Sequence, residues 1–82
     1  MARIIDGSRN NIIGERLKKA RIKAGFSQKD LSEQLEIEAV YVCRGSVSRI
    51  ENGSRTVTDI EIDAISKVLN VPLDYLFGRF PD

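Results

Sequence analysis

The chain has 82 residues, with 13 lysines and arginines against 12 aspartates and glutamates, so its formal net charge is only +1. This length is enough for one domain, and it leaves no room for an effector domain beside a binding domain. A single cysteine and no histidine exclude an internal disulfide, a Cys/His zinc site and the commonest general base. We therefore expect one domain over residues 1–82 that is not an enzyme and uses no cofactor, metal ion or small-molecule ligand.

The N-terminal segment is not expected to act as a signal peptide. Residues 1–11 are polar and mixed in charge, unlike the apolar centre of a signal peptide. No apolar run approaches the roughly 18 residues needed to span a bilayer. The sequence predicts a cytoplasmic protein with no membrane partner, a core over about residues 11–78 and a flexible arm over residues 1–10.

Apolar spacing predicts two helices in the first part of the core. One stripe at steps of 4, 3 and 4 residues marks the first helix: Ile13, Leu17, Ala20 and Ala24. Asn10 or Asn11 is its expected N-cap and Gly25 its expected C-cap. A second helix is expected after Ser27, because Asp30 three residues later completes the pattern of a capping box. Its apolar face carries Leu31 and Leu35.

The segment that follows the second helix is apolar but has no helical spacing. Residues 39–43 have strand propensity, yet a lone strand has nothing to pair with. We expect residues 37–42 to form a partly buried connection. A third helix is expected from Arg44 or Gly45, ending at the Glu-Asn-Gly segment of residues 51–53. Its core side is predicted to hold Cys43, Val47 and Ile50.

This placement makes Cys43 a small buried hydrophobe. The alternative is a redox-sensitive thiol whose pKa is lowered at the helix N-terminus. A redox sensor usually has a resolving thiol, and the chain has no second cysteine. The sequence therefore favours a buried Cys43.

Two more helices complete the chain. Thr58 and Glu61 match a second capping box, and Asn70 suits a left-handed helix end. Pro72 opens a short fifth helix that Gly78 ends. Five short helices in one small domain predict an all-α bundle, in which the second and third helices form a helix-turn-helix.

Two segments resemble the Xre-type helix-turn-helix family, which includes the phage repressor and Cro proteins. They are Ser-Gln-Lys-Asp-Leu at residues 27–31 and Ser-Val-Ser-Arg-Ile-Glu-Asn-Gly at residues 46–53, and the similarity extends over about residues 13–77. The resemblance implies a five-helix, lambda-repressor-like domain. It also implies binding to a palindromic operator in double-stranded DNA as a homodimer.

The chain departs from the family between the second and third helices. Leu35 and Val47 lie 12 positions apart, about five more than a turn of 3–4 residues allows. We therefore expect a lengthened turn, with the extra residues within the range 36–42. They either extend the second helix, bulge as a loop, or contact DNA or a partner.

The outward face of the third helix is the expected DNA-reading surface, the alternative being an ordinary solvated face. Arginine can form two hydrogen bonds with guanine, while serine and asparagine reach base edges or phosphates. The resemblance places base contacts at Arg44, Ser46, Ser48 and Arg49. It places contacts with the DNA backbone at Gln28, Asn52 and Arg55.

Two further sets have roles implied by the resemblance. The residues that match Arg21 and Glu51 form a salt bridge in the family, joining the first and third helices, so we expect a structural pair here. The apolar C-terminal end is the expected dimer interface: Leu73, Tyr75, Leu76, Phe77 and Phe80. Part of this set must close the core, and the alternative for the rest is packing on the first helix.

The position of the charges supports a nucleic-acid partner better than their sum. Residues 1–55 hold 11 basic and 7 acidic side chains, whereas residues 56–82 hold 2 and 5. The predicted function is a DNA-binding transcriptional repressor whose operator half-sites lie about 34 Å apart. The alternative is a protein-interaction module, such as an antitoxin or adaptor, that keeps the fold. A restriction–modification controller and a mobile-element regulator both remain open within the first hypothesis.

Overall fold

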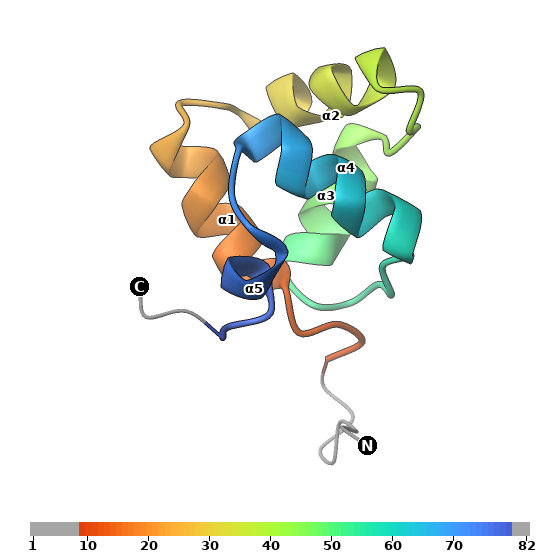
Figure 1. Ribbon diagram of the computed structural model, residues 1–82. Coiled ribbons are helices and arrows are strands. Elements are labelled where there is room, and N and C mark those ends of the chain that lie inside the picture. Colours follow the sequence, from red (N-terminus) through yellow and green to blue (C-terminus); the bar gives the residue numbers. More distant parts are fainter. Residues whose placement is uncertain (1–8, 80–82) are drawn as a thin grey trace.

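The computed structural model describes residues 9–79, which form five helices (Figure 1). They are α1 (Gly14–Lys23), α2 (Gln28–Ile37), α3 (Arg44–Glu51), α4 (Asp59–Leu69) and α5 (Leu73–Leu76). These described residues contain no strand. The prediction of an all-α domain with five helices is confirmed.

Local side-chain contacts explain where the helices begin and end. The Ser27 hydroxyl accepts a hydrogen bond from the N–H of Asp30, whose carboxylate accepts one from the N–H of Ser27. Thr58 and Glu61 make the same reciprocal pair. Asn70 ends α4 with a left-handed φ of 55°. Both expected capping boxes and the expected end of α4 are therefore present.

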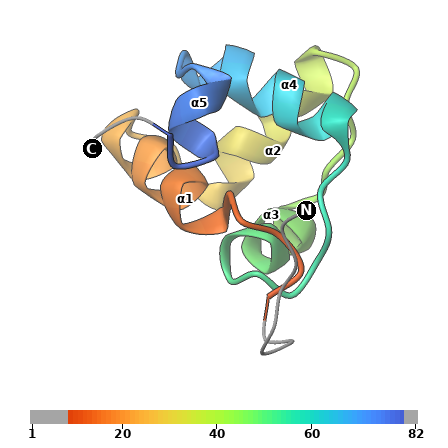
Figure 2. The ribbon, with the colours of Figure 1, turned by 60° about the horizontal axis from the view of Figure 1, so that its bottom comes forward.

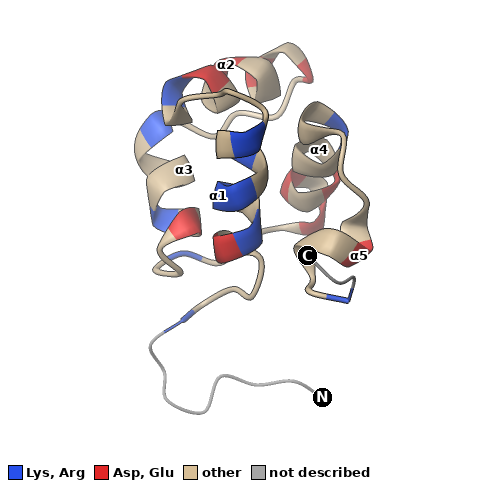
Figure 3. Ribbon diagram, turned by 90° about the vertical axis from the view of Figure 1, so that its left-hand side faces the viewer, with Lys and Arg blue, Asp and Glu red and all other residues tan. Residues whose placement is uncertain are grey.

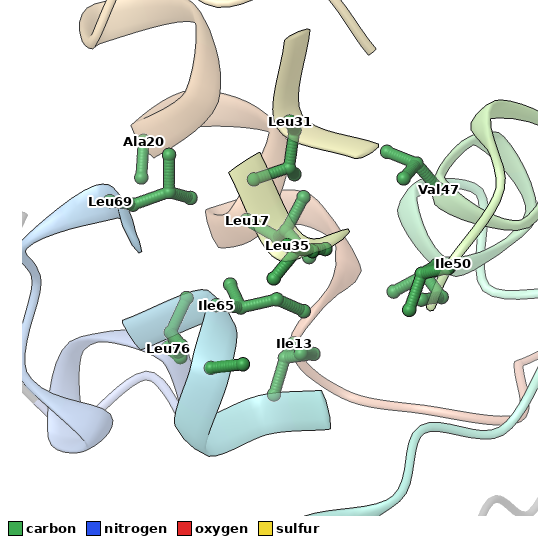
Figure 4. Packing of buried hydrophobic residues seen from close by; sticks show 12 residues of the cluster. Ile13, Leu17, Ala20, Leu31, Leu35, Val47, Ile50, Ile65, Leu69 and Leu76 are labelled. Atoms are coloured by element: carbon green, nitrogen blue, oxygen red, sulfur yellow. The ribbon is translucent and has the colours of Figure 1, made fainter. Parts of the chain in front are cut away.

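The core is formed by side chains from all five helices and from the α2–α3 connection (Figure 4). Its members are Ile13, Leu17, Ala20, Leu31, Leu35, Val42, Val47, Ile50, Ala64, Ile65, Leu69 and Leu76. Complete burial of one such leucine or isoleucine contributes about 1.5–3 kcal/mol. Leu76 is fully covered, so in this chain it closes the core rather than lying on a surface.

The predicted burial of Cys43 is wrong. Cys43 is exposed, because α3 begins one residue later and Cys43 is its N-cap, with extended backbone angles. The helical spacing from Val47 and Ile50 therefore does not extend to this residue. Val42 occupies the core position that was predicted for Cys43, with 2% of its surface exposed.

The lengthened turn combines an extended helix with a longer connection. Helix α2 continues to Ile37, which the sequence had placed in the connection. The chain then reverses at Ala39, where φ is 62°, and residues 40–43 lead to α3. Ile37 and Tyr41 remain 73% and 76% exposed. The extra residues thus leave two large apolar side chains in solvent.

Helix α3 lies at one edge of the bundle (Figure 2). It packs against α1 and α2, while α5 packs against α1 and α4. Its other side is open to solvent, where Arg44, Gly45, Arg49 and Asn52 are exposed. The fold therefore presents one face of α3 to a partner.

The left-handed backbone at Ala39 makes Ala39→Gly a stabilising substitution. A left-handed conformation costs a residue with a Cβ about 1–2 kcal/mol, and glycine removes this cost. The larger entropy of glycine in the unfolded state offsets part of the stabilisation. We expect the free energy of unfolding in urea to rise by about 0.5–1 kcal/mol. The matched control is Ala24→Gly at the end of α1, where φ is −76° and the change should destabilise. Equal destabilisation by both would contradict the expectation.

Candidate nucleic-acid interface

The exposed face of α3 carries Arg44 at its first residue and Arg49 in its last turn. Nη2 of Arg49 donates a hydrogen bond of 3.0 Å to Oγ of Ser46. A Cβ placed on Gly45 would lie 3.5 Å from Nη1 of Arg49, so the guanidinium lies over the first turn of the helix. Arg44 is exposed beside it, and Ser46 and Ser48 are half-buried. All four expected base-contacting residues therefore belong to one helix face or its flank.

Cys43 lies at the same end of α3. Its Sγ donates to Oγ of Ser46 over 3.4 Å. Hydrogen bonding by the side chain and backbone of Ser46 lowers the pKa of the Cys43 thiol, and the charge of Arg49 acts in the same direction. The only cysteine of the chain is thus an exposed thiol at the start of the candidate interface.

A buried ion pair joins α3 to α1. Nε of Arg21 lies 2.6 Å from Oε2 of Glu51, and Nη2 of Arg21 lies 3.1 Å from Oε1. The side chains are only 10% and 4% exposed. Nη1 of Arg21 donates to the carbonyl of Phe26 over 2.8 Å. This two-pronged contact fixes the end of α3 against α1.

Gln28 connects the same ion pair to α2. Its Nε2 donates to Oε1 of Glu51 over 3.1 Å, and it is the first residue of α2. The backbone N–H groups at a helix N-terminus are available to an anion such as a phosphate. Gln28 therefore lies at a candidate phosphate site while it links α2 to α3.

Arg55, an expected phosphate contact, is held by an acidic partner. Its Nη1 and Nη2 lie 3.0 and 2.8 Å from the two carboxylate oxygens of Glu61. This hydrogen bonding lowers the pKa of Glu61, against the opposing effect of its partial burial. In the described structure the Arg55 side chain thus anchors the α3–α4 loop to the start of α4. Asn52, the C-cap of α3, is exposed.

The expected dimer residues occupy different environments. Leu73 is 44% exposed, whereas Tyr75 and Phe77 are half-buried against the core. Leu76 is fully buried, and Phe80 lies outside the described residues. Of the expected residues that the structure describes, Leu73 and the outer parts of Tyr75 and Phe77 therefore offer apolar surface at this end.

Charge is distributed unevenly over the helices. Figure 3 shows lysine and arginine along α1 and on α3, each with an acidic segment at one end, and acidic residues on α4 and at the far end of α2. Basic residues thus outnumber acidic ones on α1 and α3. This distribution suits a polyanion on that side of the molecule.

These features define a helix-turn-helix domain, with α2 and α3 as its paired helices. The family model described as "Helix-turn-helix" matches residues 17–76, which is most of the chain. The chain therefore belongs to this helix-turn-helix family, in agreement with the Xre-type resemblance.

A curated relative is the HTH-type transcriptional regulator ImmR of Bacillus subtilis (strain 168). It is 36% identical over 70 residues, which cover 82% of this chain and 49% of the relative. The chain thus spans about half the length of that protein. Among residues 9–79, no helix has the length and apolar character needed to cross a membrane.

Sequence reasoning missed two contacts around the site. The pairing of Arg55 with Glu61 connects a loop to a helix, and spacing alone does not indicate it. The Asn11 side chain reaches across to α3, although the sequence indicated only its role as a cap. For both contacts, the sequence offered only a polar residue a few positions before a helix: Asn11 before α1 and Arg55 before α4.

A double-mutant cycle can measure the buried ion pair. Glu51→Gln leaves the Arg21 charge buried without its partner, so we expect the free energy of unfolding to fall by about 3–5 kcal/mol. Arg21→Met should then cost less in the Glu51→Gln background than it does alone. Urea denaturation of all four proteins checks this. Effects that add within about 0.5 kcal/mol would show that the two residues are not coupled.

The pairing of Glu61 with Arg55 predicts a pH dependence. Because the folded-state pKa of Glu61 is lowered, its stabilisation is complete above the unfolded pKa of about 4.3 and is lost as pH falls through the folded pKa. The stability difference between the wild type and Glu61→Gln should therefore shrink on acidification from pH 7 to pH 3. Urea midpoints at each pH measure it. A difference that stays constant would rule out the pairing.

Proposed function

We propose that the chain binds double-stranded DNA sequence-specifically and regulates transcription. The observation that carries the proposal is the exposed face of α3 in a helix-turn-helix domain. Arg44 is its first residue, and Arg49 belongs to its last turn. Arginine pairs with guanine in the major groove through two hydrogen bonds. The name of the curated relative, a transcriptional regulator, supports the same role.

We assign base contacts to α3 and backbone contacts to its surroundings. Arg44, Ser46, Ser48 and Arg49 are the proposed base-reading residues. Gln28 and Asn52 flank this face and are the proposed backbone contacts, because they belong to the N-terminus of α2 and the C-terminal end of α3. Arg55 joins them by exchanging part of its pairing with Glu61 for a phosphate.

The proposed active form is a homodimer on a palindromic operator. Exposed Leu73 and the outer parts of Tyr75 and Phe77 supply its interface at α5. A two-fold dimer places two copies of α3 in successive major grooves, about 34 Å apart. Repression is the proposed outcome, because a regulator that occupies a promoter excludes polymerase with no further contact.

In vitro selection tests the proposed function directly. The full chain is incubated with a random duplex library, and bound DNA is sequenced after several rounds. We expect an inverted repeat whose half-site centres lie about 10 base pairs apart. No enriched sequence at moderate salt would contradict sequence-specific binding, and a single unrepeated site would contradict the dimer.

Arg49→Ala should weaken binding to the selected DNA and relax its specificity at one position of the half-site. Because one base contact with two hydrogen bonds is lost, we expect the binding free energy to weaken by about 1–3 kcal/mol, or roughly 5- to 150-fold in affinity. Fluorescence anisotropy measures it. Lys67→Ala is the control, because Lys67 is an exposed cation on α4 paired with Asp63. If both variants bind equally well, Arg49 does not read a base.

Leu73→Glu should prevent self-association while leaving the monomer folded. Leu73 is 44% exposed, so a charge there is hydrated in the monomer but buried in the proposed dimer. Sedimentation velocity with and without the selected DNA measures the assembly state. The control is Ile22→Glu, at a 58% exposed residue of α1. A dimer that persists in Leu73→Glu would place the interface elsewhere.

Ile37 and Tyr41 favour a second candidate function, a protein-interaction module such as an antitoxin or adaptor. Both side chains are more than 70% exposed, and they lie beside Glu36 and Glu38, which would repel DNA. A stoichiometric partner lost in the Ile37→Ser/Tyr41→Ser variant, together with no selected DNA for the wild type, would favour this function.

A further inference from the structure

The segment before α1 is bound to the end of α3. The N–H of Asn10 donates to the carbonyl of Gly53 over 2.6 Å. Nδ2 of Asn11 donates to the carbonyls of Ile50 and Arg55 over 3.0 and 2.8 Å. The last carbonyls of a helix have no partner within the helix. This segment therefore supplies donors to the C-terminal end of α3 and to the loop that follows it.

Asn11 also holds the start of α1. Its Oδ1 accepts hydrogen bonds from the N–H groups of Ile13 and Gly14, over 3.0 and 2.9 Å. A primary amide has two N–H donors and an oxygen with two lone pairs. Both donors and both lone pairs of the Asn11 amide are thus used. Its oxygen accepts from the start of α1, and its nitrogen donates to the end of α3 and to the loop that follows it.

Gly14 allows the two helix ends to meet. A Cβ on this residue would overlap the carbonyl oxygen of Ile50 and lie 2.8 Å from that of Glu51. The partial positive charge at the N-terminus of α1 therefore faces the partial negative charge at the C-terminus of α3. Asn11 lies in this direct contact between helix backbones.

We propose that Asn11 is a positioning residue of the DNA interface. Because its Nδ2 donates to the carbonyls of both Ile50 and Arg55, it sets the position of the loop over residues 52–55 relative to α3. This loop carries two of the proposed backbone contacts, Asn52 and Arg55, whereas α3 carries the base contacts. The inference rests on the proposed function and adds a residue that aligns its two sets of contacts without touching DNA.

Asn11→Ser separates the two roles of the side chain. A serine hydroxyl still accepts a hydrogen bond at the start of α1, but it is too short to bond both carbonyls. The matched control is Asn10→Ser, because the side chain of Asn10 is exposed and its backbone N–H remains on Gly53. Hydrogen exchange of the Ser54 N–H, which donates to the carbonyl of Arg49, reports the loop position without DNA.

We expect faster exchange at Ser54 in Asn11→Ser and about tenfold weaker binding to the selected DNA, with the wild-type base preference retained. The plot of log K against log salt should also become shallower by about 0.9 if the Arg55 phosphate contact is lost. A merely unfolded fraction lowers the active concentration but leaves that slope unchanged. Wild-type exchange at Ser54, or an affinity and slope equal to those of Asn10→Ser, would overturn the proposal.

Two further outcomes remain decisive. If Asn11→Ser does not fold, Asn11→Asp replaces it in the exchange measurement, because a carboxylate accepts from the start of α1 but cannot donate to the two carbonyls. If the wild type selects no DNA, the proposed function fails. The exchange rate at Ser54 in Asn11→Ser then shows by itself whether Asn11 holds the loop.

Discussion

The buried contact between Arg21 and Glu51 is the constraint on which the candidate interface depends. It ties the C-terminal end of α3 to α1, and Gln28 extends it to the first residue of α2. A buried ion pair is weak evidence of net stabilisation, but its hydrogen-bond geometry admits few arrangements of the helices. Because one carboxylate orients α1, α2 and α3 together, the exposed face of α3 is presented as a rigid surface.

This rigid frame tolerates an irregular connection between its two central helices. About five residues beyond the usual helix-turn-helix spacing lengthen α2 and add an extended stretch, yet Val42 still enters the core. The cost falls on residues away from the core: Ala39 has a left-handed backbone, and Ile37 and Tyr41 remain in solvent. The core leucines of α2 and the buried residues of α3 therefore keep their contacts while the surface changes.

Much of this structure could be predicted from local signals. Capping boxes at Ser27 and Thr58 and the spacing of apolar residues located the helices, because these signals depend on near neighbours in the chain. The Arg21–Glu51 contact came from family resemblance. Cys43 was misplaced because helical spacing was extended past a helix start. The bonds of Arg55 to Glu61 and of Asn11 to Ile50 depend on how distant segments fold together, which no spacing rule describes.

The proposed function requires the exposed face of α3, including its N-terminal end, to lie against DNA. Cys43, exposed at the N-cap of α3 and alone of its kind in the chain, reports this without any substitution. The measurement is the rate of alkylation by iodoacetamide with the selected duplex bound, compared with a scrambled duplex of equal length and composition. We expect strong protection by the selected duplex and little by the scrambled one. Unchanged alkylation while the selected duplex is bound would contradict it.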